Sequence, residues 1–300
     1  MNKKTQSILL ALGAALSLTS ASAGERLELN GAGGSFPAPL YQKWCYAYTQ
    51  SERGAKVNYQ SVGSSAGISQ IKAGTVDFAG TDAPLSAEAC EEAGLEQFHM
   101  VSGAVVPAVN LPGVANGQLT LDGTTLADIY LGKITRWNDA RIAALNPGLK
   151  LPDLKVTVVH RGDGSGTTHI FTTYLSSVSD EWKARLGAAT LLKWPCGVAG
   201  QKNPGVCNCV RRVKGAIGYT EYTFALESKL SVVRIAVNGK AEEPTSATWP
   251  ILGKTYILTR KDASAEQKAA LKAYFDWCFA HGGPTAKQLH YIPVAQPKGL

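Results

Sequence analysis

The sequence has 300 residues, of which 45% are hydrophobic and 18% are charged, and its formal net charge is +7. This length allows a large buried core and favours two domains. The basic residues form no clustered run, which argues against nucleic acid as a partner, and a mildly basic chain suits a small anionic ligand.

Residues 1–23 have the features of a secretory signal. Two lysines precede an apolar stretch, Ile8–Leu18, and the small residues Ala21–Ala23 form a cleavage site. The apolar stretch is too short for a stable membrane span. Because no cysteine occurs before Cys45, lipid attachment beside the cleavage site is not expected. We therefore predict a free periplasmic protein, cleaved near Ala23, whose net charge falls from +7 to +5 with the two lysines removed.

Six cysteines follow, and in an oxidising compartment an even number predicts disulfides. Cys196 with Cys207 is the first expected pair, because the segment between them is rich in Gly, Pro and Lys and is predicted to be a loop. The full connectivity stays open. Cys207 and Cys209 are too close in sequence for the usual zinc pairing and have no histidine nearby, so no metal site is predicted. The remaining cysteines are Cys45, Cys90 and Cys278.

The mature chain opens with a strand, glycines, a hydroxyl and a helix, in that order. Leu27–Leu29 is predicted to be a short strand that leads into Gly31–Phe36, a glycine-rich segment that contains Ser35. Two prolines follow, as is common in the first turn of a helix. From Leu40 the apolar residues recur with a helical period.

A second unit of the same kind comes next. Lys56–Val62 alternates as a strand does, and Gly63–Gly67, which reads Gly-Ser-Ser-Ala-Gly, opens a helix. Thr75–Ala79 is predicted to be a further short strand, and the segment after it carries Asp82.

The third unit is centred on Arg161–Thr168, which reads Arg-Gly-Asp-Gly-Ser-Gly-Thr-Thr. Lys155–His160 is predicted to be a buried strand before it, and His169–Leu175 a helix after it. The first amides of a helix lack internal partners, and the helix dipole favours negative charge there. Arg161 adds a permanently charged fork, so we predict an anion-binding loop. An ordinary capped helix with a surface arginine is the alternative for this segment alone.

The other predicted elements alternate in the same way, which favours α/β domains. Strands are predicted at Gly103–Asn110, Gly215–Tyr219 and Val232–Val237, and helices at Thr125–Tyr130, Asp139–Leu145 and Gln267–Ala280.

Gly63–Gly67 also matches Gly-x-Ser-x-Gly, the nucleophile elbow of α/β-hydrolases, with Ser65 at its centre. Such an enzyme needs an acid and then a histidine downstream. Four of the histidines downstream are available for this role, but none lies in an informative loop motif. A serine hydrolase therefore stays open as an alternative. The histidines are His160, His169, His281 and His290.

If the chain is a binding protein, all three units would contact one ligand together. The hydroxyls of these units would donate to the oxygens of an anion, and Arg161 would supply the fixed positive charge. Asp82 is informative because a carboxylate repels an anion unless it accepts a proton that the ligand carries. The phosphate species present near neutral pH carry such a proton and sulfate does not, so phosphate is favoured. A turn or helix-cap aspartate before Ala83 is the alternative role for Asp82. The hydroxyls are those of Ser35, Ser64, Ser165 and Thr167.

Long motifs from about Leu29 to the last helix resemble the periplasmic phosphate-binding protein of the bacterial ABC phosphate importer. The resemblance covers nearly all of the mature chain. The motifs that carry it are Gly31–Pro39, Val57–Gln60, Gly63–Ser65, Thr75–Phe78, Asp82–Leu85, Asp128–Ile134, Arg161, Asp163–Thr167 and Gly215–Tyr219.

The resemblance implies an α/β periplasmic binding protein of the two-domain Venus-flytrap kind, similar to type II, with crossing strands between the domains. It implies closure on a dehydrated phosphate without cofactor or metal, no catalysis, a monomer, and delivery to a membrane-embedded ABC phosphate permease. Asp163 would orient Arg161. The phosphate contacts implied are Ser35, the Phe36 amide, Ser64, Asp82, Arg161, Ser165, Gly166 and Thr167.

We predict that residues 24–101 and 248–300 form the first domain and that residues 102–247 form the second. The chain departs from the family pattern in places. The family often has a longer insertion near Ala241–Trp249 and a final helix beyond Tyr291, and neither is expected here. Ser35 stands where the family often has threonine, which keeps the hydroxyl. A binding protein or sensor for another oxyanion is a further alternative.

Overall fold

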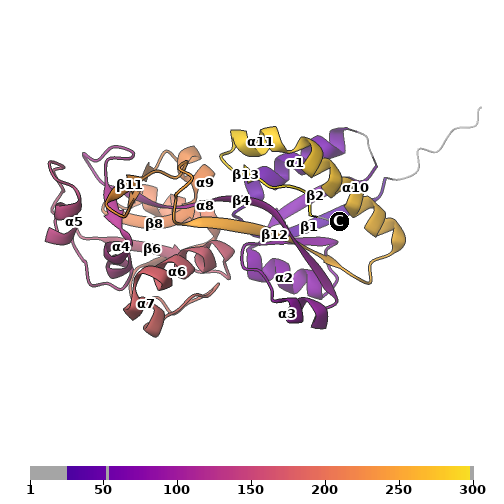
Figure 1. Ribbon diagram of the computed structural model, residues 1–300, viewed down its shortest axis with the longest axis horizontal. Helices are drawn as coiled ribbons and strands as arrows, with labels where there is room; N and C mark the ends of the chain where they lie inside the picture. The colour runs from indigo at the N-terminus through magenta and orange to yellow at the C-terminus, as the bar shows by residue number, and fades with distance from the viewer. Residues whose placement is uncertain (1–25, 52–53, 298–300) are drawn as a thin grey trace, which may run out of the picture.

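The computed structural model describes residues 26–51 and 54–297. The predicted secretory signal therefore lies outside the described residues. Within them, two lobes lie end to end along the long axis of the molecule, and the strand β4 (Leu95–Asn110) runs from one lobe into the other (Figure 1). The chain returns to the first lobe through β12 (Leu252–Arg260).

The other strands are short and belong to one lobe or the other. In chain order they are β1 (Glu28–Gly33), β2 (Lys56–Ser61), β3 (Phe78–Thr81), β5 (Thr120–Asp122), β6 (Thr157–Arg161), β7 (Val198–Gly200), β8 (Ala216–Glu221), β9 (Ser231–Val232), β10 (Arg234–Val237), β11 (Lys240–Glu242) and β13 (Ile292–Pro293).

The helices cover the sheet. In chain order they are α1 (Ala38–Gln50), α2 (Ser64–Lys72), α3 (Ala87–Glu92), α4 (Gly123–Tyr130), α5 (Ala140–Leu145), α6 (Gly166–Val178), α7 (Asp180–Arg185), α8 (Lys202–Arg212), α9 (Tyr222–Glu227), α10 (Ala265–His281) and α11 (Gly283–Gln288). Among the described residues, no helix has the length and apolar character that crossing a membrane requires.

One sheet continues through both lobes in the order β2-β1-β3-β12-β4-β8-β6-β7. β4 makes this possible because it changes partner along its length. Its residues Leu95–Ala104 pair with β12, and Val105–Asn110 pair with β8. The strands β1, β2 and β3 of the first lobe are parallel to each other, as are β6, β7 and β8 of the second. Ligands of parallel α/β sheets bind beyond the carboxyl ends of the strands, which here face the junction of the lobes.

Aromatic side chains fill the core of each lobe. In the first lobe Phe78 packs edge-to-face against Phe275 of α10, with ring centroids 5.4 Å apart. In the second lobe Phe171 of α6 stacks on Tyr219 of β8 at 4.3 Å. Burial of such large rings is the main stabilising contribution to an α/β core.

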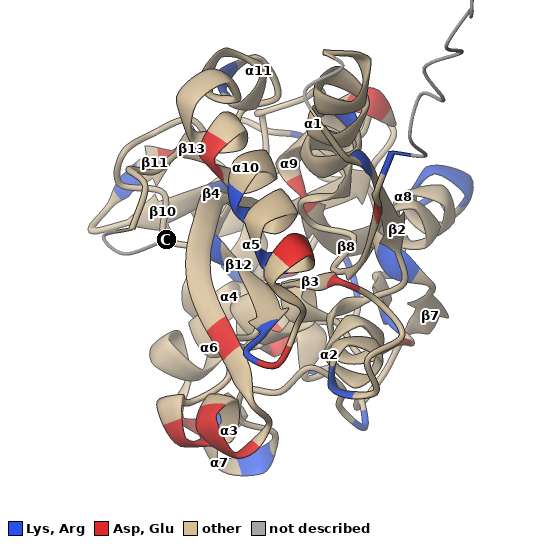
Figure 2. Cartoon of the chain, turned by 90° about the vertical axis from the view of Figure 1, so that its right-hand side faces the viewer, with Lys and Arg blue, Asp and Glu red and all other residues tan. Residues whose placement is uncertain are grey.

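Charged residues of both signs are interspersed over the elements of the first lobe (Figure 2).

The α/β fold predicted from the sequence is confirmed, and most predicted elements are present within a few residues. The helix predicted at Gln267–Ala280 extends over Ala265–His281 and begins with a capping box at Ser264. Two predictions need adjustment. The strand predicted at Val232–Val237 is divided into β9 and β10, and β4 begins earlier than Gly103.

The loop predicted between Cys196 and Cys207 is wrong, because the segment contains the short strand β7 and α8 begins at Lys202. Proline and glycine stand in the first turn of this helix, where a missing N–H costs little. Beyond them the buried residues Val206, Cys207 and Val210 recur with helical spacing and pack under the sheet.

The predicted disulfides are also wrong for this structure. All six cysteines lie in the described part of the chain, and each is a free thiol. The expected pair fails because its members belong to different environments. Cys207 lies on the buried face of α8, where its Sγ is 3.5 Å from Oγ1 of Thr220, whereas Cys196 lies against the Tyr130 carbonyl at the end of α4.

Candidate anion-binding site between the lobes

The first lobe brings three loops to the junction at the ends of β1, β2 and β3. Gly33 ends β1 at a φ of +146°, and a Cβ there would lie 2.0 Å from the Gly80 carbonyl oxygen. Only glycine fits this close approach of two strands. The next residue, Gly34, donates its N–H to the same carbonyl at 2.8 Å, which holds the chain in place as Ser35 begins the turn into α1.

Ser64 and Asp82 stand side by side in the first lobe, and both are buried. Ser64 is the first residue of α2, and its Oγ accepts the N–H of Asp82 at 3.3 Å. The same hydroxyl donates to Oδ2 of Asp82 at 3.4 Å. We call Ser35, Ser64 and Asp82 the first-lobe wall.

The Asp82 carboxylate is only half satisfied. Its Oδ1 is buried and has no hydrogen-bond partner among the described residues. Burial raises the pKa of Asp82 to about 7, although the neighbours Thr255, Arg161 and Ser64 lower it. An unpaired buried acceptor is costly in a protein interior, so a ligand that donates a hydrogen bond here would be stabilised.

The second lobe contributes the end of β6 and the start of α6. Ser165 is the N-cap of α6, and its Oγ accepts the N–H of Thr168 at 3.0 Å. The positive end of the helix dipole therefore lies at Gly166 and Thr167. We call Arg161, Asp163, Ser165, Gly166 and Thr167 the second-lobe wall.

Arg161 is 2% exposed and is held by Asp163 in a bidentate pair. Nε donates to Oδ1 at 2.7 Å and Nη2 donates to Oδ2 at 2.5 Å. Burial raises the pKa of Asp163, but the bonds and charge of Arg161 outweigh it, so this pKa lies below its usual range. The third guanidinium nitrogen, Nη1, is buried and has no hydrogen-bond partner among the described residues. Arg161 therefore keeps one charged donor for a ligand.

The two walls touch each other. The Gly166 N–H donates to the Ser64 Oγ at 3.1 Å, and the Ser65 N–H donates to the Gly164 carbonyl at 3.2 Å. A Cβ on Gly166 would lie 2.5 Å from the Cβ and Oδ2 of Asp82. The lobes are therefore closed on one another, with the half-satisfied carboxylate and the start of α6 in contact.

The structure brings the predicted residues of both lobes together at this junction. The predicted contact of Phe36 involves its main-chain amide rather than its side chain. Its ring is fully buried, and its carbonyl accepts the Tyr291 hydroxyl at 2.7 Å, so its position is fixed from the far side. A role for its amide stays a prediction. The described residues contain no group of three or more His, Cys, Asp or Glu that could hold a metal ion.

The sequence did not point to Asn203, although it lies at the centre of the junction. This residue is fully buried in the first turn of α8. Its Nδ2 donates to the Oγ of Ser35 at 3.0 Å and to Oγ1 of Thr167 at 3.3 Å, so it contacts both walls. The preceding residue, Lys202, donates its N–H to Oδ1 of Asp163 at 3.0 Å. No motif marked either residue, because their segment was predicted to be a loop.

The geometry at Ser65 differs from that of a hydrolase. Its hydroxyl donates to Oγ1 of Thr190 at 3.3 Å. No histidine in the described part of the chain makes a hydrogen bond with Ser65. His160, for example, stacks on Trp194 and bonds the Arg161 carbonyl. A serine nucleophile requires a base within hydrogen-bond reach, and this serine has a threonine there.

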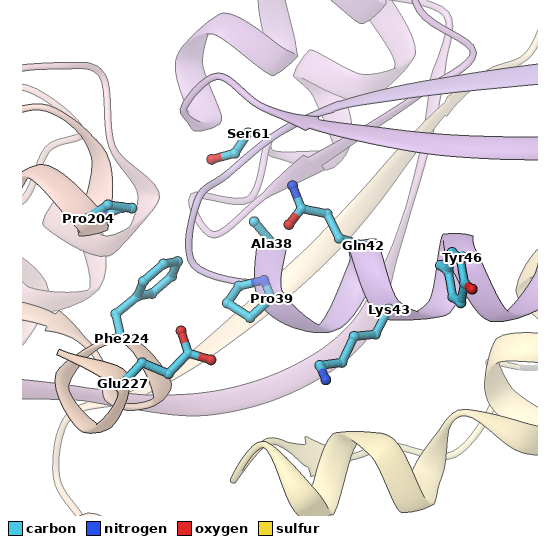
Figure 3. A pocket seen from close by; sticks show the side chains of 9 residues that line it. All are labelled: Ala38, Pro39, Gln42, Lys43, Tyr46, Ser61, Pro204, Phe224 and Glu227. Carbon is cyan, nitrogen blue, oxygen red and sulfur yellow. The ribbon is translucent and has the colours of Figure 1, made fainter. Parts of the chain in front are cut away.

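A groove lies outside the junction on one side of the seam between the lobes (Figure 3). It encloses about 520 Å³ and has Pro204 and Phe224 of the second lobe facing Ala38 and Pro39 of the first. None of the residues of the two walls lines it. Asp82 lines a different, smaller cavity of about 270 Å³, together with His169 and Tyr256.

Comparison with known proteins shows the family of the chain. A family model described as a PBP superfamily domain matches residues 18–281. The chain is similar to the phosphate-binding protein PstS of Xylella fastidiosa, with 43% identity covering 92% of this chain and 84% of the relative. It is also similar to the phosphate-binding protein PstS of Pasteurella multocida, with 42% identity covering 89% of this chain and 86% of the relative.

A solved structure shows the same fold. It is that of a high-affinity periplasmic phosphate-binding protein, PfluDING, bound with phosphate. Its TM-score is 0.73 at 20% sequence identity, and the match covers 90% of this chain and 91% of that chain.

Proposed function

The chain belongs to the PstS family of phosphate-binding proteins in the PBP superfamily, and we propose from this premise that it binds inorganic phosphate and delivers it to an ABC-type permease. One observation carries the proposal. A buried acceptor, Oδ1 of Asp82, and a buried charged donor, Nη1 of Arg161, are both without a hydrogen-bond partner among the described residues, on walls that touch. A ligand that suits both needs negative charge and a proton.

Phosphate has this combination near neutral pH. Its ionised oxygens would accept hydrogen bonds from Arg161, from the start of α6 and from the hydroxyls of Ser35, Ser64 and Thr167. Its remaining proton would be donated to Asp82. Charge-assisted hydrogen bonds of this kind contribute roughly twice as much as neutral ones. The family name of the relatives supports this ligand class.

Selectivity follows from Asp82. Sulfate has the same shape but no proton near neutral pH, so its oxygen would face the lone pairs of the carboxylate. Leaving two buried acceptors against each other costs on the order of several kcal/mol, which is sufficient for discrimination by orders of magnitude. A site that read charge alone would not distinguish the two anions.

The protein acts in the periplasm after cleavage of its signal, as a monomer that hands phosphate to a membrane-embedded permease. It performs no covalent chemistry. The relatives are named as binding proteins, which supports this role. The first domain comprises residues 24–101 and 248–300 and the second comprises residues 102–247, and the partner change in β4, between Ala104 and Val105, lies near this boundary, which supports the division.

The direct test is to ask whether the purified protein carries phosphate. Unfolding releases the bound anion, which a malachite-green assay quantifies against protein concentration. After exhaustive dialysis, calorimetric titration with phosphate and with sulfate should give one site per chain that prefers phosphate. Equal affinity for the two anions, or no binding of either, contradicts the proposal.

The hydrolase alternative has its own test. Turnover of ester and phosphoester substrates should be absent from the wild type and unchanged in Ser65→Ala. Turnover that disappears in this variant would show that Ser65 is a nucleophile.

A further inference from the structure

In the junction between the lobes, Asn203 makes hydrogen bonds with both the oxygen and the nitrogen of its side-chain amide. Its Oδ1 accepts from the Thr220 hydroxyl at 3.0 Å and from the Glu221 N–H at 3.2 Å, both in the second lobe. Its Nδ2 donates to Ser35 and Thr167 at 3.0 Å and 3.3 Å. The side chain is thus anchored on β8 and reaches across to the first lobe.

Only one of the two possible orientations of this side-chain amide satisfies its neighbours. An N–H of the main chain can only donate, so the Glu221 N–H requires an acceptor opposite it. Turning the Asn203 amide over would place its NH₂ group against that N–H, donor against donor. The backbone of β8 therefore fixes Oδ1 on one side, and Nδ2 must face Ser35 and Thr167.

This arrangement determines which way the Ser35 hydroxyl points. Its Oγ accepts two N–H groups from Asn203, the side-chain Nδ2 at 3.0 Å and the main-chain N at 3.2 Å. A hydroxyl has two lone pairs and one hydrogen. With both lone pairs in use, Ser35 can only donate its hydrogen to a further partner.

The other wall hydroxyls are bonded differently. The Oγ of Ser64 accepts the N–H groups of Asp82 and Gly166, but its hydrogen is already donated to Oδ2 of Asp82. The Oγ of Ser165 accepts the N–H of Thr168, and Oγ1 of Thr167 accepts Nδ2 of Asn203. Ser35 is therefore the wall hydroxyl whose two acceptor positions are both filled by Asn203, one of them through a side chain that a single substitution can remove.

We propose that Asn203 is a positioning residue that turns the Ser35 hydroxyl into an obligate donor toward the bound anion, holds the Thr167 hydroxyl beside it through one hydrogen bond, and makes this state conditional on closure of the lobes. The proposal rests on the proposed function, because it requires an anion between the walls. Since Ser35 lies in the first lobe and the anchor lies in the second, the bond exists only when the lobes meet.

The residue before Asn203 strengthens the same link. Lys202 has a φ of +57°, a conformation that side-chain-bearing residues seldom adopt. Its main-chain N–H bonds Asp163, and its Nζ donates to the Ser61 carbonyl of the first lobe at 2.5 Å. The two consecutive residues therefore connect the Arg161–Asp163 pair with the first lobe, beside the groove that Ser61 and Pro204 line (Figure 3).

A double-mutant cycle tests whether Asn203 acts through Ser35. Asn203→Asp keeps an acceptor for the β8 anchor and loses the donor, and Ser35→Ala removes the hydroxyl. Each single change should weaken phosphate binding by about 10- to 100-fold, mainly by faster dissociation. The double variant should bind no more than about threefold more weakly than the weaker single variant, because both changes remove one interaction.

The matched control is Asn208→Asp, the same chemical change on the exposed side of α8, which should leave phosphate affinity unchanged within about twofold. Asn203→Ala repeats the cycle without a buried charge, in case the aspartate prevents folding. Thermal melting of each ligand-free variant reports folding separately. Additive losses in both cycles would overturn the proposal. Absence of phosphate binding in the wild type would instead overturn the proposed function.

Discussion

The two walls of the site differ in what they offer an anion. The second-lobe wall has a fixed cation, Arg161, and the positive end of α6. The first-lobe wall has a carboxylate, Asp82, whose pKa burial raises to about 7. We therefore propose that the second-lobe wall attracts any oxyanion and that Asp82 of the first-lobe wall favours an anion that carries a proton.

This difference separates affinity from selectivity. Charge and helix dipole act on sulfate and phosphate alike, because both are tetrahedral and negative. A buried acceptor discriminates between them, because it is paired by one ligand and left opposed by the other. Changes in the second lobe should therefore lower the affinity for both anions, and changes at Asp82 should alter their ratio.

The largest effect is expected from Arg161→Met, which removes the cation and keeps much of the side-chain length. Asp163 then stays partly buried without its partner. Removal of one member of a buried ion pair lowers the free energy of unfolding by about 3–5 kcal/mol. We expect phosphate and sulfate affinity to fall together by at least about 100-fold. Titration calorimetry with both anions measures this, and a loss confined to phosphate would contradict the separation of roles.

Gly166→Ala should disrupt the contact between the walls while keeping the charged groups and hydroxyls of both walls. The added Cβ would lie 2.5 Å from the Cβ of Asp82 and from the Oγ of Ser64, so the lobes could not close fully. We expect a loss of about 100-fold in phosphate affinity with little change in the melting temperature of the ligand-free protein. Gly283→Ala is the control, because a Cβ there meets nothing within 4 Å. Equal affinity of the two variants would argue against closure on the ligand.

The sequence predicted most of both walls because their chemistry is local. In each unit a strand ends, glycines and a hydroxyl follow, and a helix begins, and each of these features has a short-range signature. Ser64 and Ser165 could be placed at helix starts for this reason. The resemblance to a known family then related the units to one ligand.

The rest depended on long-range contacts. Asn203 is separated by 168 residues from Ser35, and no local pattern reports that the two meet. The segment around Asn203 also resembled a loop, since helix propensity is a weak guide where proline and glycine fill the first turn. Free thiols were missed for a similar reason, because an even cysteine count does not report which side chains lie close together.

Asp82→Asn should sharpen the comparison by changing the selective wall alone. The amide keeps the size of the carboxyl group, and it can accept weakly or donate. We expect phosphate affinity to fall by about 10-fold, far less than in Arg161→Met, and sulfate affinity to rise. Titration of this variant with both anions decides the matter. An unchanged preference for phosphate over sulfate would show that Asp82 is not the selective group.

The smallest effect is expected when the pH is changed and sulfate affinity is measured on the wild-type protein. The raised pKa of Asp82, about 7, means that this carboxyl gains its proton as the pH falls through 7, well above the ordinary value of 3.8. The protonated group can donate to an oxygen that carries no hydrogen, so sulfate affinity should rise severalfold between pH 8 and pH 5.5. Asp82→Asn is the matched control, because its amide does not titrate and its sulfate affinity should lack this rise. A parallel pH dependence in both proteins would assign the effect to other groups, such as His169 near the same junction.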